Sequence, residues 1–242
     1  MATETLSQRV KLWVKHDPSP VARYLLRLWH ATRQLNMPVV PFLHRALYYS
    51  HCHGKDAVIF LLSKLYWTPL FRSQLAGSSA GLRLSGAGMP LISGRLKIEC
   101  GDACRLSVAI TFSGRSAGMH TPQLKIGNNV GIGWQSTLAC GTRIELHDNV
   151  RIAQGCFLAG YPGHPLDPAK RAASLPDTDD QCGDIILERD VWLGSGVRVL
   201  PGVRIGRGSI IGTGSVVTQD IPANVLAAGS PARIIRHLES AV

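Results

Sequence analysis

The sequence predicts an all-β solenoid with an α-helical extension at its N-terminal end. Two observations predict the solenoid. Aliphatic residues recur at every sixth position over much of the chain, and glycine is abundant, with 25 among 242 residues. A third observation predicts the extension, because the first 78 residues lack this period and space their apolar residues as helices do.

The six-residue period is clearest between residues 187 and 221. Its aliphatic positions are Leu187, Leu193, Val199, Ile205, Ile211 and Val217, and small or β-branched residues follow four positions later, at Val191, Val197, Val203, Ser209, Ser215 and Ile221. Side chains alternate along a strand, so every sixth one returns to the same face. An amphipathic helix would not tolerate so many glycines and β-branched residues. The period therefore predicts coils of three short strands, stacked as a triangular prism.

The same period extends towards the N-terminus in earlier blocks. Their positions are Ile126, Ile132, Leu138 and Ile144, then Leu146, Ile152 and Leu158 after a shift of two, with an earlier trace at Cys100, Leu106 and Phe112. Residues suited to tight corners stand between the strands, at Asn128, Asn129, Asp148, Asn149, Arg207 and Gly208. We expect a helical extension over 1–78, a β-helix over 79–223, and a C-terminal cap and helix over 224–242.

Two segments rich in glycine, proline and polar residues interrupt the period. They are SGRSAGMHTPQ at 113–123 and GYPGHPLDPAKRAASLPDTDDQCGD at 160–184. Insertions in solenoids project from one face and often carry the binding site. The second is long for a loop of a compact domain, which favours a function.

The N-terminal region contains two segments, 20–35 and 56–75, with apolar and basic helical faces. Trp13, Trp29 and Trp67 lie in this region among arginines and lysines. One interpretation is peripheral membrane contact through residues 1–75, because tryptophan and arginine suit the headgroup layer. The other is that the helices pack on the solenoid end or on a neighbouring subunit. The pattern fits both.

The composition limits the kinds of partner and the cellular compartment that we expect for this chain. Lysine and arginine exceed the acids by ten, with a pI near 9.7, which suits an anionic partner or serves solubility alone. No stacking motif or groove helix supports nucleic-acid binding. The six cysteines lack zinc spacing, the first residues lack a signal-peptide pattern, and no apolar run approaches a membrane span. We therefore expect a cytoplasmic protein without a metal or a nucleic-acid partner.

Three stretches of the chain resemble one known family. They are GHPLDPAKR at 163–171, DVWLGSGVRVLPGVRIGRGSIIGTGSVVTQDIP at 190–222 and NVLAAGSPARIIR at 224–236. With the repeat, they resemble the hexapeptide-repeat acetyltransferases, in particular the maltose and galactoside O-acetyltransferase branch. The resemblance implies a left-handed parallel β-helix that forms a homotrimer with active sites between subunits. It also implies acetyl transfer from acetyl-CoA to a hydroxyl-bearing saccharide, which could be a surface polysaccharide or a lipid-linked sugar.

By position, His164 matches the catalytic histidine of that family. A sugar hydroxyl is a weak nucleophile, and histidine is the side chain best suited to accept its proton near neutral pH. Direct transfer then needs no acyl-enzyme. A solvated loop histidine is the alternative interpretation.

The resemblance also assigns the acetyl-CoA site. The matching positions are Trp192, Ser195, Thr213, Thr218, Arg233 and Arg236, with the two arginines in a short helix expected from Pro231. The arginines would lie near the nucleotide phosphates. A lysine usual in the family is Gln219 here, which removes one coenzyme contact.

The acceptor site departs from the family pattern. The asparagine that binds the acceptor in the family is absent between Gly133 and Gln135. We expect Gln135 to replace it and Trp134 to stack on a sugar ring.

Other functions remain as alternatives. A carbonic anhydrase would need three histidines that meet across adjacent coils, and the uneven spacing of His120, His147 and His164 disfavours it. A trimeric scaffold without catalysis would bind no coenzyme A. A transferase acting on xenobiotics or other small molecules shares the donor chemistry and differs in its acceptor.

Overall fold

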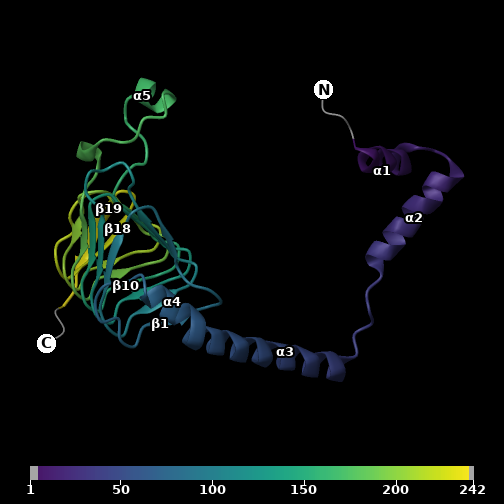
Figure 1. Ribbon diagram of the computed structural model, residues 1–242, viewed down its shortest axis with the longest axis horizontal. Coiled ribbons are helices and arrows are strands. Elements are labelled where there is room, and N and C mark those ends of the chain that lie inside the picture. Colours follow the sequence, from purple (N-terminus) through teal and green to yellow (C-terminus); the bar gives the residue numbers. More distant parts are fainter. Residues whose placement is uncertain (1–4, 240–242) are drawn as a thin grey trace. The chain divides into compact units, whose positions relative to one another are not determined.

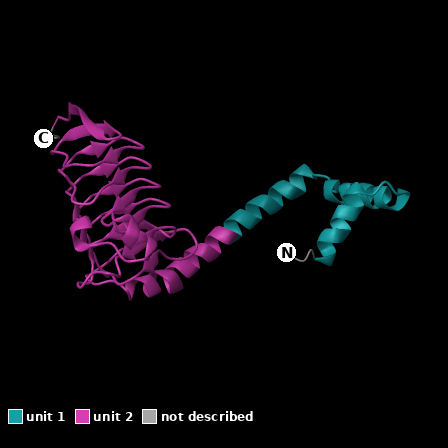
Figure 2. Ribbon diagram, turned by 90° about the horizontal axis from the view of Figure 1, so that it is seen from above, with its two compact units in different colours: residues 1–54 teal, residues 55–242 magenta. Residues whose placement is uncertain are grey.

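The computed structural model describes residues 5–239. The ends of the two expected terminal regions, residues 1–4 and 240–242, lie outside the described part. The chain forms two compact units, residues 1–54 and residues 55–242. Figure 1 shows the chain coloured along its sequence, and Figure 2 colours the two units separately.

Residues 5–54 are helical, as the sequence predicts. They contain α1 (Leu6–His16), α2 (Pro20–Gln34) and the first part of α3 (Pro41–Leu62). Ser19 caps α2 by accepting a hydrogen bond from the Ala22 amide at 3.2 Å. A small cavity of about 240 Å³ between α1 and α2 is lined by Val10, Lys11, Val14, Lys15, Leu25 and Trp29.

Helix α3 continues through a π-helical turn (Ser63–Trp67) into α4 (Thr68–Arg72). Of the helices in residues 5–239, none combines the length and the apolar character needed to cross a bilayer.

Residues 76–239 wind into a triangular prism of three sheets (Figure 2). Sheet I contains β1 (Arg83–Ser85), β4 (Arg105–Ser107), β7 (Gly131–Ile132), β10 (Arg151–Ile152), β13 (Trp192–Leu193), β16 (Ile210–Ile211), β18 (Val225–Gly229) and β19 (Ala232–His237). Sheet II contains β2 (Leu91–Ser93), β5 (Thr111–Gly114), β8 (Thr137–Cys140), β11 (Phe157–Ala159), β14 (Arg198–Val199) and β17 (Val216–Val217). Sheet III contains β3 (Lys97–Cys100), β6 (Gln123–Ile126), β9 (Arg143–Leu146), β12 (Ile185–Leu187) and β15 (Arg204–Ile205). Each coil passes from sheet I to II to III, so the prism has a I/II, a II/III and a III/I corner.

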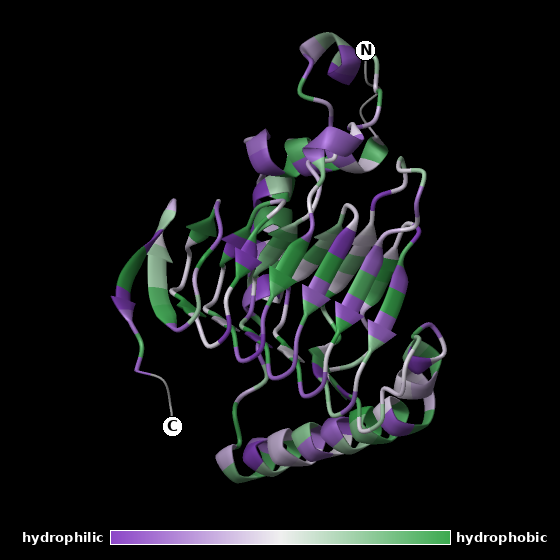
Figure 3. Ribbon diagram, turned by 90° about the vertical axis from the view of Figure 1, so that its left-hand side faces the viewer, coloured by the Kyte–Doolittle hydropathy of each residue, from purple (hydrophilic) through white to green (hydrophobic). Residues whose placement is uncertain are grey.

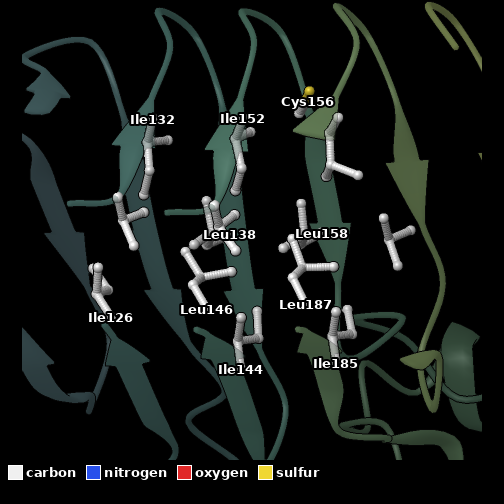
Figure 4. Close-up of a cluster of buried hydrophobic side chains, with 14 of the residues drawn as sticks. Ile126, Ile132, Leu138, Ile144, Leu146, Ile152, Cys156, Leu158, Ile185 and Leu187 are labelled. Atoms are coloured by element: carbon white, nitrogen blue, oxygen red, sulfur yellow. The ribbon is translucent and has the colours of Figure 1, made fainter. Parts of the chain in front are cut away.

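The aliphatic positions of the period form the core, as predicted. Their side chains are buried and stack in rows along the prism axis (Figure 4). Hydrophobic and hydrophilic residues alternate along the strands (Figure 3). The shift of two arises because β9 is long enough to bury both Ile144 and Leu146. Two residues are one strand period, so the core face is kept.

Half of the predicted corner residues have the positive φ expected there, whereas Asn128, Asp148 and Arg207 do not. Asn129, Asn149 and Gly208 have φ of 53°, 61° and 67° at the III/I corner. The side chains also bond along this corner, because Asn129 Nδ2 donates to Asn149 Oδ1 at 2.8 Å and Asn149 Nδ2 donates to Asp190 Oδ1 at 2.8 Å. Successive coils are therefore held together at the corner as well as by the sheets.

The first end of the prism is covered by α4. Phe71 is buried, and its ring stacks on Phe112 of β5 with centroids 6.3 Å apart. Trp67 packs against the same core.

The other end of the prism corrects one expectation. The segment after Pro231 is the strand β19, paired antiparallel with β18, and not a helix. Proline marks turns as well as helix starts, and the β-branched pair Ile234 and Ile235 favours a strand. Pairing with β18 also satisfies backbone groups at the end of sheet I.

Candidate active site

Both insertions leave the prism at the II/III corner. Residues 113–123 begin at the end of β5 and lead into β6, and residues 160–184 join β11 to β12. The longer one carries α5 (Pro168–Ala172) and a 3-10 turn (Asp179–Gln181), and it projects from the prism (Figure 1). Two segments that are far apart in the sequence therefore share one corner.

A buried ion pair joins the two insertions. Arg115, in the first insertion, donates from Nε to Asp177 Oδ1 at 2.6 Å and from Nη2 to the Asp177 carbonyl at 2.7 Å. Its Nη1 also contacts the Asp179 carboxylate. Arg115 and Asp177 are 4% and 5% exposed, so water hardly competes for them. Burial opposes the charge of Arg115, but the hydrogen bonds to Asp179 and Asp177 raise its pKa overall.

The same cluster fixes the backbone beside His164. Asp177 Oδ2 accepts a hydrogen bond from the Gly163 amide at 3.0 Å, and Gly163 has a φ of 80° that suits glycine. On the other side, Arg171 Nη1 donates to the Pro165 carbonyl at 2.9 Å. The His164 side chain itself is exposed. The loop thus holds both flanks of a histidine that faces solvent.

The residues predicted to bind acetyl-CoA are distributed over several places. Ser195 and Thr213 lie at the I/II corner on adjacent coils, where the Gly214 amide donates to the Ser195 carbonyl at 2.8 Å. Trp192 is the first residue of β13 on sheet I. Thr218 follows β17 at the II/III corner, and the two arginines, Arg233 and Arg236, are exposed on β19.

The structure brings Trp134 and Trp192 together. Both line a groove of about 580 Å³ on the outer face of sheet I, and their side chains are 54% and 50% exposed. Gln135 follows Trp134 at the I/II corner with a φ of 55°. One predicted acceptor residue, Trp134, and one predicted donor residue, Trp192, therefore share a surface.

Within one chain, His164 does not join this surface. It lies at the II/III corner, whereas Trp134, Gln135, Ser195 and Thr213 lie at the I/II corner. Sheet II separates the two corners.

Sequence reasoning did not find Arg115 and Asp177. Each is one charged residue in a polar insertion, and they are 62 positions apart. No spacing pattern connects them, so only the folded corner reveals the pair.

The histidines weighed for a metal site do not meet either. His120 and His164 belong to the insertions at the II/III corner, and His147 lies at the III/I corner. Among residues 5–239, no three His, Cys, Asp or Glu side chains form a group that could hold a metal ion.

Comparison with known proteins agrees with the repeat. Residues 184–219 match the family described as bacterial transferase hexapeptide, six repeats. The galactoside O-acetyltransferase of Escherichia coli K12 is 38% identical over 115 residues, which cover 48% of this chain and 54% of that protein. The chain is related to the hexapeptide-repeat acetyltransferases. The polysialic acid O-acetyltransferase of Escherichia coli O1:K1 is also 38% identical, over 46% of this chain and 37% of that protein.

The chain spans about half the length of the curated relatives it matches. Among solved structures, an N-acyltransferase from Bacillus cereus in complex with dTDP and coenzyme A has a TM-score of 0.56 and 19% identity. The match covers 71% of this chain and 88% of that one. The fold is therefore a left-handed parallel β-helix, as the resemblance implied.

Proposed function

We propose that this chain is an acetyl-CoA-dependent O-acetyltransferase that modifies a saccharide, with His164 as general base. The observation that carries the proposal is the loop at the II/III corner. A buried ion pair and two backbone hydrogen bonds fix the flanks of His164, while its side chain stays open to a substrate. An ordinary surface histidine does not require such support.

The chemistry is a direct transfer. The acceptor hydroxyl oxygen attacks the thioester carbonyl carbon while His164 takes the hydroxyl proton. The tetrahedral intermediate then collapses, the carbon–sulfur bond breaks, and the proton passes to the departing coenzyme A thiolate. The products are the acetyl ester and coenzyme A.

We further propose that the active site forms between subunits of a homotrimer. The support is the separation of the candidate residues, because His164 lies at the II/III corner, Trp134 and Ser195 lie at the I/II corner, and Trp192 lies on sheet I. Cyclic packing of three prisms can place the II/III corner of one subunit beside the I/II corner of the next. Acetyl-CoA would then lie in that cleft, along Ser195 and Thr213, with Thr218, Arg233 and Arg236 contributing further along it.

The experiment is a coenzyme A release assay on the full chain with acetyl-CoA and a panel of sugars, polyols and antibiotics. We expect turnover with a saccharide and loss of at least about a hundredfold in kcat for His164→Ala, within the usual range for general-base catalysis. Circular dichroism checks that the variant folds. Equal turnover by the parent and by His164→Ala would refute the role of His164 as general base. A chain that binds no acetyl-CoA would instead be a scaffold.

The helical unit suits contact with an anionic membrane surface, which we propose as the location of the enzyme, on the cytoplasmic side where acetyl-CoA is available. Large apolar side chains on α1 and α2 are exposed, among them Trp13, Tyr24 and Leu28. The basic residues of positions 5–54 outnumber the single acid Asp17; they are Arg9, Lys11, Lys15, Arg23, Arg27, Arg33 and Arg45. Such a combination binds interfacially. A polysaccharide or lipid-linked acceptor made at that surface would then be within reach.

Vesicle flotation tests this location. The full chain should float with vesicles that contain phosphatidylglycerol, and Arg23→Gln with Arg27→Gln should reduce recovery severalfold, because each lost charge weakens binding by about 1 kcal/mol. Lys97→Gln with Lys125→Gln removes the same charge from sheet III and serves as the matched control. Equal recovery of all three proteins would contradict the proposed surface.

A further inference from the structure

The groove on sheet I is open to solvent and is lined by small residues and two tryptophans. The small residues include Gly131, Gly133 and Ala153, and the tryptophans are Trp134 and Trp192. Trp192 lies in the same register row as Gly131, two strands away, and Trp134 lies three residues after Gly131. The two tryptophans are therefore offset along the strands as well as across them. Both border the groove, so sugar rings of one chain can meet two aromatic side chains there.

Two arginines also line the groove. The strand register places Arg105 opposite Gly131, Gly131 opposite Arg151, and Arg151 opposite Trp192, in one row across the outer face of sheet I. The Arg151 side chain lies against the glycine between the arginines, since a Cβ there would lie 3.3 Å from Arg151 Cδ. The residues that line the groove include both arginines and neither aspartate nor glutamate.

The contacts of these guanidinium groups are with neutral oxygens. Arg151 Nη1 donates to the carbonyls of Asn129 and, at 3.1 Å, of Val150, and Arg105 Nη2 lies 3.5 Å from Asn129 Oδ1. These contacts hold the Arg151 side chain in place, and none of them is with a carboxylate. Burial and the neighbouring charge of Arg105 lower the pKa of Arg151. An anion in the groove would relieve this repulsion.

Asp190, at the III/I corner, is the acid near these arginines, and it has polar partners of its own. It accepts a hydrogen bond from Asn149 Nδ2 at 2.8 Å, and its carboxylate lies 3.5 Å from Arg189 Nε.

From this geometry we infer that the groove binds an anionic saccharide, so that the acceptor of the proposed transferase carries carboxylate or phosphate groups along a chain of sugars. Sugar rings stack on Trp134 and Trp192, and the arginines bind the anionic substituents. The volume of the groove, about 580 Å³, lies within the usual range for ligand sites. This inference rests on the proposed function for its acceptor role, but the binding itself can be measured without turnover.

The test uses two matched probes on the full chain without acyl donor. One is a trigalacturonate and the other is the same trisaccharide with its carboxylates reduced to alcohols. We expect quenching of tryptophan fluorescence by both, with the uronate bound at least about tenfold more tightly, as charge-assisted hydrogen bonds predict. Equal affinity for the two probes would overturn the inference.

Substitutions locate the effect. Arg151→Gln and, separately, Arg105→Gln should reduce the preference for the uronate severalfold and leave binding of the neutral trisaccharide unchanged. Lys125→Gln, which removes the same charge from β6 on sheet III, should keep the full preference. If the control loses it too, the preference comes from the overall charge of the chain and the groove is not its source.

Three further outcomes separate this inference from the proposed function. If coenzyme A displaces the uronate competitively, the groove belongs to the donor, and the inference is wrong. If the uronate binds but no saccharide is acetylated, the groove stands and the transferase proposal falls. If neutral sugars are acetylated and the uronate is not preferred, the transferase stands and the inference falls.

Discussion

At the scale of single residues, Arg115 and Asp177 have the most consequence for the candidate site. Breaking a buried ion pair by removing one partner costs about 3–5 kcal/mol, because the other charge remains buried. In this chain the pair joins the two insertions, and Asp177 also accepts a hydrogen bond from the Gly163 amide, beside His164. We therefore assign both residues a positioning role for His164.

Asp177→Asn tests that role. The neutral asparagine side chain cannot form the ion pair with Arg115 and also accept the hydrogen bond from the Gly163 amide. The loop should therefore open more often, while the prism stays folded. Trypsin should cleave at Lys170 and Arg171 at least about tenfold faster, since 1.4 kcal/mol already gives a tenfold change in population. In the transferase assay, kcat should fall with little change in the KM for acetyl-CoA.

Asp167→Asn is the matched control, in the same loop. Asp167 caps the exposed helix α5 by accepting from the amides of Ala169 and Lys170, and asparagine caps nearly as well. Unchanged proteolysis and kcat in Asp177→Asn would remove the positioning role.

At the scale of elements, buried serines of the repeat form hydrogen bonds between successive coils inside the prism. Ser209 occupies a buried position of the small-residue row, where most coils have valine. Its Oγ donates to the Pro222 carbonyl at 2.6 Å and accepts from the Val225 amide at 3.2 Å, on the following coil. Ser136 bridges to the next coil in the same way. These serines satisfy backbone groups that the strands leave unpaired.

Ser209→Val should therefore destabilise the fold, although it brings the position closer to the repeat consensus. It leaves a buried carbonyl and a buried amide unpaired, and each such group costs about 1–3 kcal/mol. Urea unfolding followed by circular dichroism measures the change. A variant as stable as the parent would mean that burial of the valine outweighs both hydrogen bonds.

The sequence predicts elements better here than it predicts the site. The core positions from Leu187 to Val217 could be found because one period repeats one physical requirement, a buried side chain on each face. The strand β19 was not predicted, since Pro231 suits a helix start and a turn equally, and only pairing with β18 decides between them. The Arg115–Asp177 pair and the groove arginines depend on which coils become neighbours, which no local pattern contains.

At the scale of the whole molecule, the separation of His164 from Trp134 and Trp192 predicts complementation. Co-expression of His164→Ala with the double variant Trp134→Ala and Trp192→Ala should restore activity that neither has alone. In randomly mixed trimers, roughly a quarter of the interfaces combine an intact histidine with intact tryptophans. Activity near that fraction of the parent, measured by coenzyme A release, is the expected result.

Tagging the two variants differently and purifying on both tags in succession establishes whether mixed trimers form. If they form and remain inactive, all the essential residues act within one chain and the site between subunits is wrong.

The two ends of the prism have a consequence for solubility. The repeat itself does not limit how many coils can stack. Unpaired strand edges at the ends of the stack can therefore pair with other chains and form fibres. At the first end, the bulky rings of α4 lie where another coil would dock. At the last end, β19 presents Arg233 and Arg236, and like charges on two such edges repel each other. The same strand that was expected as a helix thus acts as a barrier to fibrous growth.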